Sequence, residues 1–401
     1  ILPAVLLSDG PCVIENLPDI SDVSTILKTM QSLGAQIRMI NKSTVEIDPR
    51  HVNSFVVSKK MAEGMRASSY FLGALLGRML RARVAPPGGC DFGVRPIDQH
   101  IKGFEALGAK MTIENGMVDA KAMSLTGCLI YLDVVSVGAT INIMLAAAKA
   151  DGLTIIENAA REPHIVDLAN FLNSMGANIM GAGTGVIKIR GVKHLNGTNY
   201  SIIPDQIEAG TYMAAAVATR GDILVTNVTP KHLESIIAKL RETGAEITEF
   251  DESVRVKMTR RPRKCNVKTM PHPGFPTDMQ PQIAAVLSIA EGTSIITEGV
   301  WDSRFRYVEQ LTFMGADIQV DGKMAVITGV EKLKPSPVRA VDLRAGAAMI
   351  IAGLSAEGTT EIEEIDHIDR GYENVVEKFS ALGADIKRVK TFDNFQALKQ
   401  A

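Results

Sequence analysis

Hydrophobic residues along this chain follow two different periods, which alternate from one segment to the next. Apolar side chains recur every three or four positions across residues 22–33, and this spacing predicts an amphipathic helix. Apolar and polar residues alternate across 36–40 and 246–250, as expected for strands with one buried face. A third type of segment is rich in small residues and apolar on nearly every face, which predicts buried helices. These segments are 65–80, 137–150, 207–220, 279–290 and 343–356.

The same series of segments recurs along the whole chain. A Gly-Ala doublet follows each predicted amphipathic helix, and consecutive doublets lie 68 to 74 residues apart. Glycine tolerates the left-handed conformation that commonly ends a helix, so each doublet predicts a helix C-terminus. A second marker, as in DGPCVIEN and DGLTIIEN, precedes most doublets by 23 to 25 residues. The glycines of the doublets are Gly34, Gly108, Gly176, Gly244, Gly315 and Gly383.

Six repeated units predict an α/β protein of two domains. One unit of this size cannot bury both of its faces, whereas three units can enclose a shared core of small-residue helices. We expect a first domain of residues 1–203, a second of residues 204–390, and a tail of residues 391–401. The connection between the domains is expected near Ser201–Pro204.

Composition excludes several classes of protein. With 45 acidic and 43 basic residues, the net charge does not favour binding to nucleic acid or to an anionic membrane. The longest apolar stretch, about residues 345–356, is too short to span a membrane. Four cysteines without paired spacing fit reduced thiols in the cytoplasm better than a disulfide framework. Seven histidines form no metal-binding motif, and we expect neither a bound metal nor a cofactor.

Four arginines occupy unusual positions, at or just before predicted helix starts. The first turn of a helix carries unpaired N–H groups and the positive end of the helix dipole, so arginine is locally unfavourable there. Each could be a surface arginine paired with a nearby aspartate. Together they favour a site for phosphate or carboxylate, and a small anion with several charges fits. The four are Arg66, Arg304, Arg344 and Arg370.

The second unit replaces its ordinary marker with the loop PPGGCDFGVRPID. Its prolines and glycines predict an exposed segment that holds Cys90 close to Arg95, where a cation can stabilise a thiolate. The alternative is a turn with an inert thiol. Cys12 and Cys128 lie in strand patterns and are expected in or near the core. Basic neighbours could lower the pKa of Cys265, which remains a weaker candidate for the reactive thiol.

A third unusual segment, PHPGFPTDMQPQ, approaches a helix that is expected to begin near Asp278. Its prolines favour an extended backbone before that helix. Spacing alone favours Asp278 as a helix N-cap. The same interpretation applies to Asp205 and Glu208 in IPDQIEAG.

Six segments have a specific wording and order: PPGGCDFGVRPIDQH, VSVGAT, ENAAREPHIVD, PHPGFPTDMQ, LRAGAAMIIAG and HIDRGYE. In both respects the chain resembles the UDP-N-acetylglucosamine 1-carboxyvinyltransferases, a branch of the enolpyruvyl transferase family. The resemblance extends to about residue 390, and parts of it are similar to Gram-positive members. It implies a two-domain inverted α/β barrel with six βαβαββ-type repeats, three in each domain.

The resemblance also implies an addition followed by an elimination, which begins peptidoglycan synthesis. The 3′-hydroxyl of UDP-N-acetylglucosamine attacks C2 of phosphoenolpyruvate while C3 is protonated, and the intermediate then loses a C3 proton and phosphate. Cys90 matches the residue associated with protonation of C3, with phosphate release and with alkylation by fosfomycin. Asp278 matches the proposed base at the sugar hydroxyl, and Arg370 is the third residue placed in catalysis.

The remaining site residues follow from the same resemblance. Arg66, Arg95 and Arg370 match residues that bind phosphoenolpyruvate or its phosphate, and Arg304 and Arg344 match residues that line the same cleft. The residues expected at the nucleotide sugar are Arg95, Pro96, Asp98, Ser136, Val137, Gly138 and Asp22. Val300 is expected as one further substrate-binding residue. The expected partners are the two small substrates, without nucleic acid or membrane.

The chain departs from the family pattern at its start. Family members begin with a strand of the second domain and a Gly-Ala-Lys-Asn segment whose lysine contacts phosphoenolpyruvate, whereas this sequence starts at Ile1, beyond that pair. We therefore expect the chain as written to have low activity, low stability and an unpaired strand edge. Smaller departures are Gln206, where an arginine is common, and Val134, where some members have a lysine.

Three other functions remain open. The 3-phosphoshikimate 1-carboxyvinyltransferases share the fold and the donor, but their loop lacks the PGGC cysteine, so Cys90 discriminates between the two activities. A non-catalytic remnant that binds a UDP-sugar would account for the missing start. RNA 3′-phosphate cyclase shares the repeat architecture, but the balanced charge of this chain counts against nucleic acid.

Overall fold

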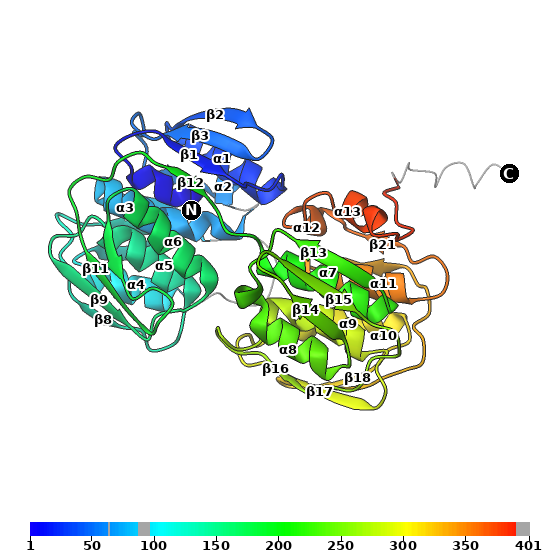
Figure 1. The fold of residues 1–401 in the computed structure, drawn as a ribbon. Coiled ribbons are helices and arrows are strands. Elements are labelled where there is room, and N and C mark those ends of the chain that lie inside the picture. Colours follow the sequence, from blue (N-terminus) through cyan, green and yellow to red (C-terminus); the bar gives the residue numbers. More distant parts are fainter. Residues whose placement is uncertain (63–64, 87–96, 390–401) are drawn as a thin grey trace, which may run out of the picture.

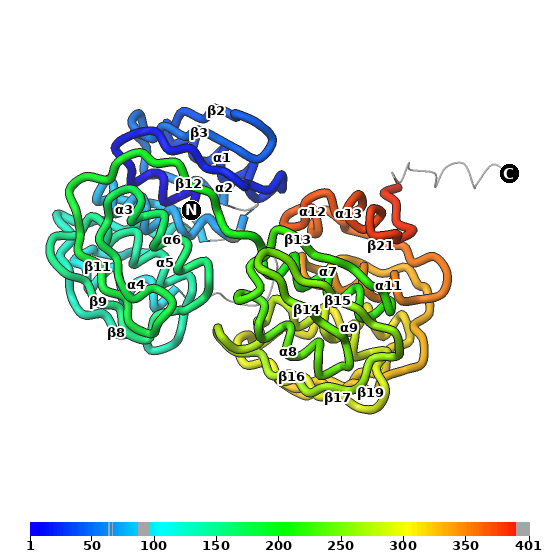
Figure 2. Tube along the Cα trace, viewed as in Figure 1, coloured from blue at the N-terminus to red at the C-terminus, as the bar shows by residue number. Residues whose placement is uncertain are grey.

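The computed structural model describes residues 1–62, 65–86 and 97–389. It has two lobes side by side, with the first half of the chain in one lobe and the second half in the other (Figure 1). The tube in Figure 2 follows the chain from one lobe to the other through residues 202–205. This connection lies between strand β12 (Asn199–Ser201) and helix α7 (Gln206–Thr219).

The helices of the first lobe form an inner and an outer set. The inner helices are buried and contact one another, as their small, apolar sequences predict. They are η1 (Leu2–Leu7), α3 (Tyr70–Met79) and α5 (Val137–Ala147). The outer helices are α1 (Ser21–Ser32), α4 (Asp98–Ala106) and α6 (Pro163–Ser174). Two short elements, α2 (Lys59–Ala62) and η2 (Arg66–Ser69), precede α3.

The second lobe repeats this arrangement around α7. Its other inner helices are α9 (Gln280–Leu287) and α11 (Leu343–Ser355), and both contact α7 and each other. Its outer helices are α8 (Glu234–Glu242), α10 (Val308–Phe313) and α13 (Val375–Ala381). Short helical turns are η3 (Pro230–Leu233), η4 (Thr277–Met279), η5 (Phe305–Tyr307) and α12 (Asp366–Asp369).

Three four-stranded sheets surround the inner helices of the first lobe. In each sheet a short strand pairs in parallel with a central strand, and the remaining pairs are antiparallel. The orders are β12-β1-β3-β2, β4-β5-β7-β6 and β8-β9-β11-β10. The strands are β1 (Cys12–Glu15), β2 (Gln36–Asn41), β3 (Thr44–Asp48), β4 (Val56–Val57), β5 (Arg81–Val84), β6 (Lys110–Glu114), β7 (Met117–Lys121), β8 (Leu129–Tyr131), β9 (Leu153–Glu157), β10 (Asn178–Met180) and β11 (Val186–Arg190).

The sheets of the second lobe are less complete. Their orders are β13-β15-β14, β16-β17-β19-β18 and β20-β21. The strands are β13 (Asp222–Thr226), β14 (Glu246–Glu249), β15 (Ser253–Lys257), β16 (Val267–Lys268), β17 (Thr293–Thr297), β18 (Asp317–Asp321), β19 (Met324–Thr328), β20 (Val338–Arg339) and β21 (Ile362–Glu363). Within the residues that the structure describes, β13 has no short parallel neighbour.

All six outer helices end at the glycine of a Gly-Ala doublet, which confirms the prediction from sequence. The six glycines have φ between +87° and +109°, the left-handed region that glycine adopts at least cost. The alanine that follows donates its N–H to a carbonyl five residues earlier, as in Ala35 to Met30 at 3.0 Å. This pattern satisfies carbonyl groups that the helix end would otherwise leave unpaired.

Apolar side chains form two separate buried clusters, one within residues 2–195 and the other within residues 207–379. Each lobe therefore has its own hydrophobic core. In the parts of the chain that the structure describes, no helix combines the length and the apolar character needed to cross a membrane.

Candidate active site

The carboxylate of Asp278 lies between two arginines of the second lobe. Asp278 belongs to η4, while Arg304 directly precedes η5 and Arg344 lies in the first turn of α11. Arg304 Nη2 donates to Oδ1 at 3.1 Å, and Arg344 approaches Oδ2 with Nε and Nη2, each at 3.1 Å. Arg304 is 1% exposed and Arg344 is 9% exposed, whereas the Asp278 side chain is 32% exposed, so both cations are buried while the carboxylate remains accessible to solvent. Charge-assisted bonds on both oxygens fix the orientation of the carboxylate.

The N-cap interpretation of Asp278 is wrong. Asp278 is the middle residue of η4, whose N-cap is Pro276, and its carboxylate bonds to arginine side chains from other elements. Pro276 has an extended backbone, as the proline-rich sequence predicts. The chain therefore enters the short turn with Asp278 directed at the helix starts that carry Arg304 and Arg344.

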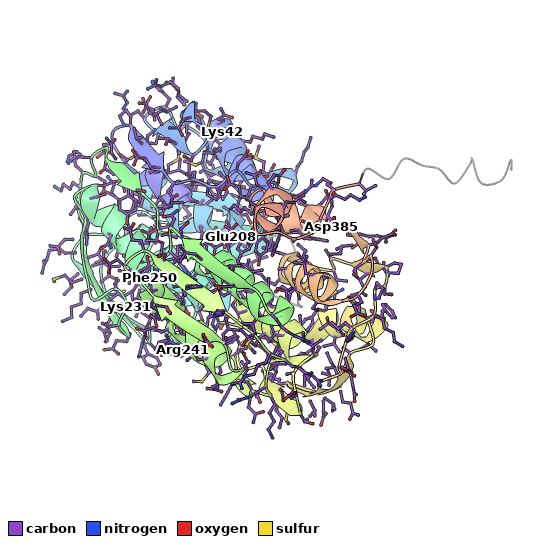
Figure 3. The ribbon with its side chains drawn as sticks, turned by 45° about the vertical axis from the view of Figure 1, so that its right-hand side comes forward. Lys42, Glu208, Lys231, Arg241, Phe250 and Asp385 are labelled. Carbon is purple, nitrogen blue, oxygen red and sulfur yellow. The ribbon has the colours of Figure 1, made fainter. Side chains whose placement is uncertain are left out.

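Asp205, in contrast, is an N-cap, as its spacing predicts. Its Oδ1 accepts from the N–H groups of Ile207 and Glu208 at the start of α7, at 2.7 and 3.2 Å. The Glu208 carboxylate pairs with Lys378 Nζ on α13 at 2.7 Å, and Figure 3 shows it beside the segment that carries this helix. Burial raises the pKa of Glu208, and Lys378 acts in the opposite direction.

A buried glutamate joins the segment of Asp278 to the segment of Arg304. Glu298 is 1% exposed and accepts four hydrogen bonds, which satisfy a charge that would be costly to bury alone. The donors are Thr277 Oγ1, Gln280 Nε2 and the N–H groups of Val300 and Trp301, at 2.8 to 3.2 Å. One carboxylate thus fixes η4 and the loop before η5 together, and it also positions Val300, an expected substrate contact.

Arg370 contacts Asp22 of the first lobe. Its Nε donates to Oδ1 at 2.9 Å and its Nη2 donates to Oδ2 at 3.2 Å. Close by, the N–H of Asp19 donates to Glu373 Oε1 at 2.8 Å, which adds a second link between the lobes. A pocket of about 460 Å³ is lined by residues near these links, from α1 on one side and from the α12–α13 segment on the other. Two residues predicted to contact different substrates therefore meet across the two lobes.

The expectation that four arginines lie at helix starts is wrong for Arg370. Arg66 begins η2, Arg304 precedes η5 and Arg344 follows the N-cap of α11. Arg370 instead follows the last residue of α12, because this helix closes after one turn, where the N–H of Gly371 bonds to the Ile368 carbonyl. Arginine at a helix C-terminus is electrostatically favourable.

The starts of α4 and α5 form a third group, in the first lobe. Asp98 is the first residue of α4, and Ser136 is the N-cap of α5, where its side chain accepts from the N–H of Ala139. Val137 and Gly138 open α5. His100 packs so closely on Gly138 that an added Cβ would lie 2.9 Å from its Nε2. Burial lowers the pKa of this histidine to about 4, against the opposing effect of Asp98.

Two polar residues at the start of α6 were missed by the sequence reasoning. The N–H of His272 donates to Glu162 Oε1 at 3.3 Å, so Glu162 joins the first lobe to the proline-rich segment before Asp278. Desolvation lowers the pKa of His164, while the carboxylates of Glu162, Asp205 and Asp278 act in the opposite direction. The segment ENAAREPHIVD was recognised for its wording, but periodicity gives no signal for which of its polar residues faces the other lobe.

Residues 87–96 of the loop that carries the predicted thiol lie outside the described residues, and these include Cys90, Arg95 and Pro96; the side chain of Arg66 also lies outside them. The surroundings of the alternative thiol, Cys265, disfavour its ionisation. Burial and a hydrogen bond to Glu242 raise its pKa to about 12, so the expectation that basic neighbours would lower this pKa is wrong. Cys12 is buried in β1, and Cys128 is half-buried just before β8.

Three groups of residues thus lie at the ends of helices and in short turns of both lobes, most of them at helix starts and Arg370 at the C-terminus of α12. One holds a carboxylate between arginines, the second joins an arginine to an aspartate across the lobes, and the third presents the N-termini of α4 and α5. Fixed arginines and helix N-termini stabilise anions, and an oriented carboxylate can accept a proton.

Comparison with known proteins identifies the family. The family model described as EPSP synthase (3-phosphoshikimate 1-carboxyvinyltransferase) matches residues 1–379. UDP-N-acetylglucosamine 1-carboxyvinyltransferase 3 of Caldanaerobacter subterraneus subsp. tengcongensis is 57% identical over 390 residues, which are 97% of this chain and 93% of the relative. UDP-N-acetylglucosamine 1-carboxyvinyltransferase of Clostridium botulinum is 55% identical over 390 residues, 97% of this chain and 94% of the relative.

Solved structures agree in fold. The enolpyruvyl transferase NikO from Streptomyces tendae has a TM-score of 0.88 and 26% identity, over 96% of this chain and 92% of its own. EPSP synthase from Acinetobacter baumannii has a TM-score of 0.75 and 18% identity over 97% of this chain and 94% of its own, which shows a shared fold alone. From the family model and the relatives above 50% identity, this chain belongs to the enolpyruvyl transferase family and, within it, to the UDP-N-acetylglucosamine 1-carboxyvinyltransferases.

Proposed function

We propose that this protein transfers the enolpyruvyl group of phosphoenolpyruvate to the 3′-hydroxyl of UDP-N-acetylglucosamine, with release of phosphate. This reaction is the first committed step of peptidoglycan synthesis. The observation that carries the proposal is 57% identity over 97% of the chain to a relative named for this activity. A small acceptor sugar and a trianionic donor also suit a site made of fixed arginines and helix N-termini.

The chemistry divides into an addition and an elimination. In the addition, the sugar 3′-oxygen bonds to C2 of phosphoenolpyruvate, the hydroxyl proton leaves to a base, and C3 gains a proton. In the elimination, C3 loses a proton, the double bond between C2 and C3 forms again, and the bond from C2 to the phosphate oxygen breaks. Charge shifts at C2 in both steps, so the site must stabilise it with groups that are already in place.

We assign the base at the sugar hydroxyl to Asp278. Its carboxylate is held on both oxygens by Arg304 and Arg344, whose burial keeps their orientation fixed. A base held in one orientation reduces the entropy lost on reaching the transition state. We assign Cys90, in the loop PPGGCDFGVRPID, to protonation of C3 and to phosphate release, on the resemblance to the family.

The donor phosphate is assigned to Arg370, Arg66 and Arg95, and Arg304 and Arg344 line the same cleft. Because Arg370 is paired with Asp22 across the lobes, binding of the phosphate must compete with this pair or share the arginine with it. The nucleotide sugar is assigned to Asp98, Ser136, Val137 and Gly138 at the starts of α4 and α5 and to Asp22, Arg95 and Pro96. Val300 is assigned to substrate binding without a choice between the two substrates.

We further propose that the chain consists of six βαβαββ-type units, three in a domain of residues 1–203 and three in a domain of residues 204–390, followed by a tail of residues 391–401. This arrangement corresponds to the two-domain inverted α/β barrel. The six glycine-capped outer helices and the two separate cores support it. A cytoplasmic location is proposed because four cysteines without paired spacing suit a reducing compartment.

The acceptor decides between this activity and that of the 3-phosphoshikimate enzymes. Phosphate release from phosphoenolpyruvate is measured with protein in excess over substrate, so that slow turnover still registers, in the presence of either UDP-N-acetylglucosamine or 3-phosphoshikimate. We expect phosphate and enolpyruvyl-UDP-N-acetylglucosamine with the first acceptor only. Binding of the sugar nucleotide without any product would favour the non-catalytic alternative, and product from 3-phosphoshikimate alone would favour the other transferase.

A further inference from the structure

A buried hydroxyl joins the three inner helices of the second lobe behind Asp278. Tyr372 follows α12 and is 3% exposed. Its hydroxyl lies 2.8 Å from Thr211 Oγ1 on α7, and it accepts from Gln282 Nε2 on α9 and from Arg344 Nη1 on α11, both at 3.3 Å. One oxygen atom therefore contacts a polar side chain from each of the three helices.

One assignment of donors satisfies every group in this network. With the Thr211 hydroxyl proton on the Ile207 carbonyl at 2.8 Å, Thr211 Oγ1 accepts from Tyr372. The two lone pairs of the tyrosine oxygen are then available to Gln282 and Arg344, which can only donate to it. The hydroxyl uses its full bonding capacity and cannot leave without unpairing several buried groups, each of which is costly to leave unsatisfied.

Arg344 is held by two partners on opposite sides of its guanidinium. Nε and Nη2 bond to Asp278, and Nη1 bonds to Tyr372, whose ring centroid lies 5.6 Å from the guanidinium carbon. The bond to Tyr372 restrains the guanidinium independently of Asp278. If Tyr372 did not hold the other side, the guanidinium could turn with the carboxylate.

We propose that Tyr372 is a positioning residue for the base, acting through Arg344 to keep the Asp278 carboxylate aimed at the sugar hydroxyl. This inference rests on the proposed function and deepens it. Tyr372 touches no substrate in this role. It orients the Asp278 carboxylate through two successive hydrogen bonds, one from Arg344 to Tyr372 and one from Arg344 to Asp278. Misplacement of a reacting group by a fraction of an ångström to an ångström is enough to slow an enzyme about a hundredfold.

The test replaces Tyr372 with phenylalanine and uses Tyr212→Phe as a matched control. Tyr212 is also a buried tyrosine of the second lobe, with its ring 4.7 Å from that of Phe379, but its hydroxyl has no hydrogen-bond partner among the described residues. We expect Tyr372→Phe to lower kcat about 10- to 100-fold while the Kd of UDP-N-acetylglucosamine changes less than about threefold. Tyr212→Phe should leave kcat unchanged.

A double-mutant cycle separates positioning from plain loss of stability. If Tyr372 acts through Arg344, Tyr372→Phe should slow an Arg344→Lys background much less than it slows the unaltered protein. Equal effects in both backgrounds, or a Tyr372→Phe variant as active as Tyr212→Phe, would overturn the inference. Thr211→Val serves if Tyr372→Phe does not fold. It leaves Tyr372 in place but removes the hydroxyl that contacts Tyr372, Gln282 Nε2 and the Ile207 carbonyl, and it should lower kcat with unchanged sugar-nucleotide binding. An unaltered protein without turnover would instead overturn the proposed function, and this inference with it.

Discussion

The two lobes share one arrangement of helices, but different kinds of hydrogen bond connect the inner helices of each lobe. In the first lobe, Asn142 on α5 bonds to backbone groups, accepting from the N–H of Gly73 at 2.8 Å and donating to the Gly138 carbonyl at 3.0 Å. In the second lobe, polar side chains bond to one another, through Tyr372 and Arg344, and lead to Asp278. The bonds of Asn142 hold two helix backbones close together in the first lobe. The bonds of Tyr372 and Arg344 in the second lobe instead orient ionised side chains at the candidate site.

The sheets of the two lobes also differ, in how many of them include a short parallel strand. In the first lobe each of the three sheets has four strands, and each includes a short parallel strand, such as β12, which returns to pair with β1. In the second lobe, among the residues described, β17 and β21 have such a neighbour and β13 does not. The first lobe thus has three complete four-stranded sheets, and the second combines the charged groups of the candidate site with a β13 that has no short parallel neighbour in the part of the chain described.

The sharpest test of this difference is Asp278→Asn. It keeps the size of the side chain and removes the charge that Arg304 and Arg344 hold, so we expect product formation to fall at least about a thousandfold. Binding of UDP-N-acetylglucosamine should stay within about tenfold, because a base contributes more to the transition state than to the bound ground state. Rapid-quench experiments measure the rate of product formation, and calorimetric titration measures the Kd of UDP-N-acetylglucosamine.

Asp205→Asn is the matched control, since asparagine caps a helix about as well as aspartate. It should leave both turnover and melting temperature nearly unchanged. Normal turnover in Asp278→Asn combined with a lowered melting temperature would mean that the Asp278 carboxylate serves folding and not catalysis.

Among the residues with a described structure, β13 lacks the short parallel neighbour that β1, β5 and β9 have, so an added strand should stabilise the second lobe. The chain is extended before Ile1 by a family-like strand ending in Gly-Ala-Lys-Asn, and a second version carries alanine in place of that lysine. A strand on β13 would pair N–H and C=O groups as β12 does for β1, so both versions should melt at a higher temperature. Only the version with lysine should gain turnover, since one charge-assisted contact contributes about 2–4 kcal/mol in the transition state. Equal turnover with and without the extension would contradict the role assigned to the lysine.

Sequence predicted the architecture better than it predicted the site. The Gly-Ala doublets located every outer helix end, because glycine at positive φ is a local requirement of the backbone. The partner of Asp278 could not be found locally, since Arg304 and Arg344 lie 26 and 66 positions away, in different units. The role of Tyr372 in HIDRGYE could not be predicted either, because its hydrogen-bond partners are also distant in sequence. Periodicity says that a side chain is buried, but it does not say which buried polar groups meet.

A third prediction compares close backbone approach in the two lobes. A Cβ at Gly73 would lie 2.4 Å from the backbone oxygen of Asn142, whereas a Cβ at Gly210 would meet the ends of the Met279 and Ile236 side chains at 2.9 to 3.0 Å. Gly73→Ala should therefore destabilise the protein by about 3 kcal/mol, because the helices must move apart. Gly210→Ala should cost less than about 1 kcal/mol, since flexible side chains can shift and alanine favours the helix. Denaturant unfolding of both variants measures the contrast, and similar losses would show that the side chains around Gly210 yield no more easily than the backbone next to Gly73.

The smallest expected effect is a pH dependence that belongs to the first lobe. His100 packs on Gly138 at the start of α5, and burial lowers its pKa from 6.5 to about 4. The folded protein therefore prefers the neutral ring, so the contribution of His100 to stability is complete above pH 6.5 and is lost as the pH falls toward 4. The difference amounts to at most about 3 kcal/mol. The free energy of unfolding is measured at pH 7.5 and at pH 4.5 for the unaltered protein and for His100→Leu, which cannot titrate. We expect the variant to lose less stability between the two values of pH, and an identical loss in both proteins would assign the acid sensitivity to other groups.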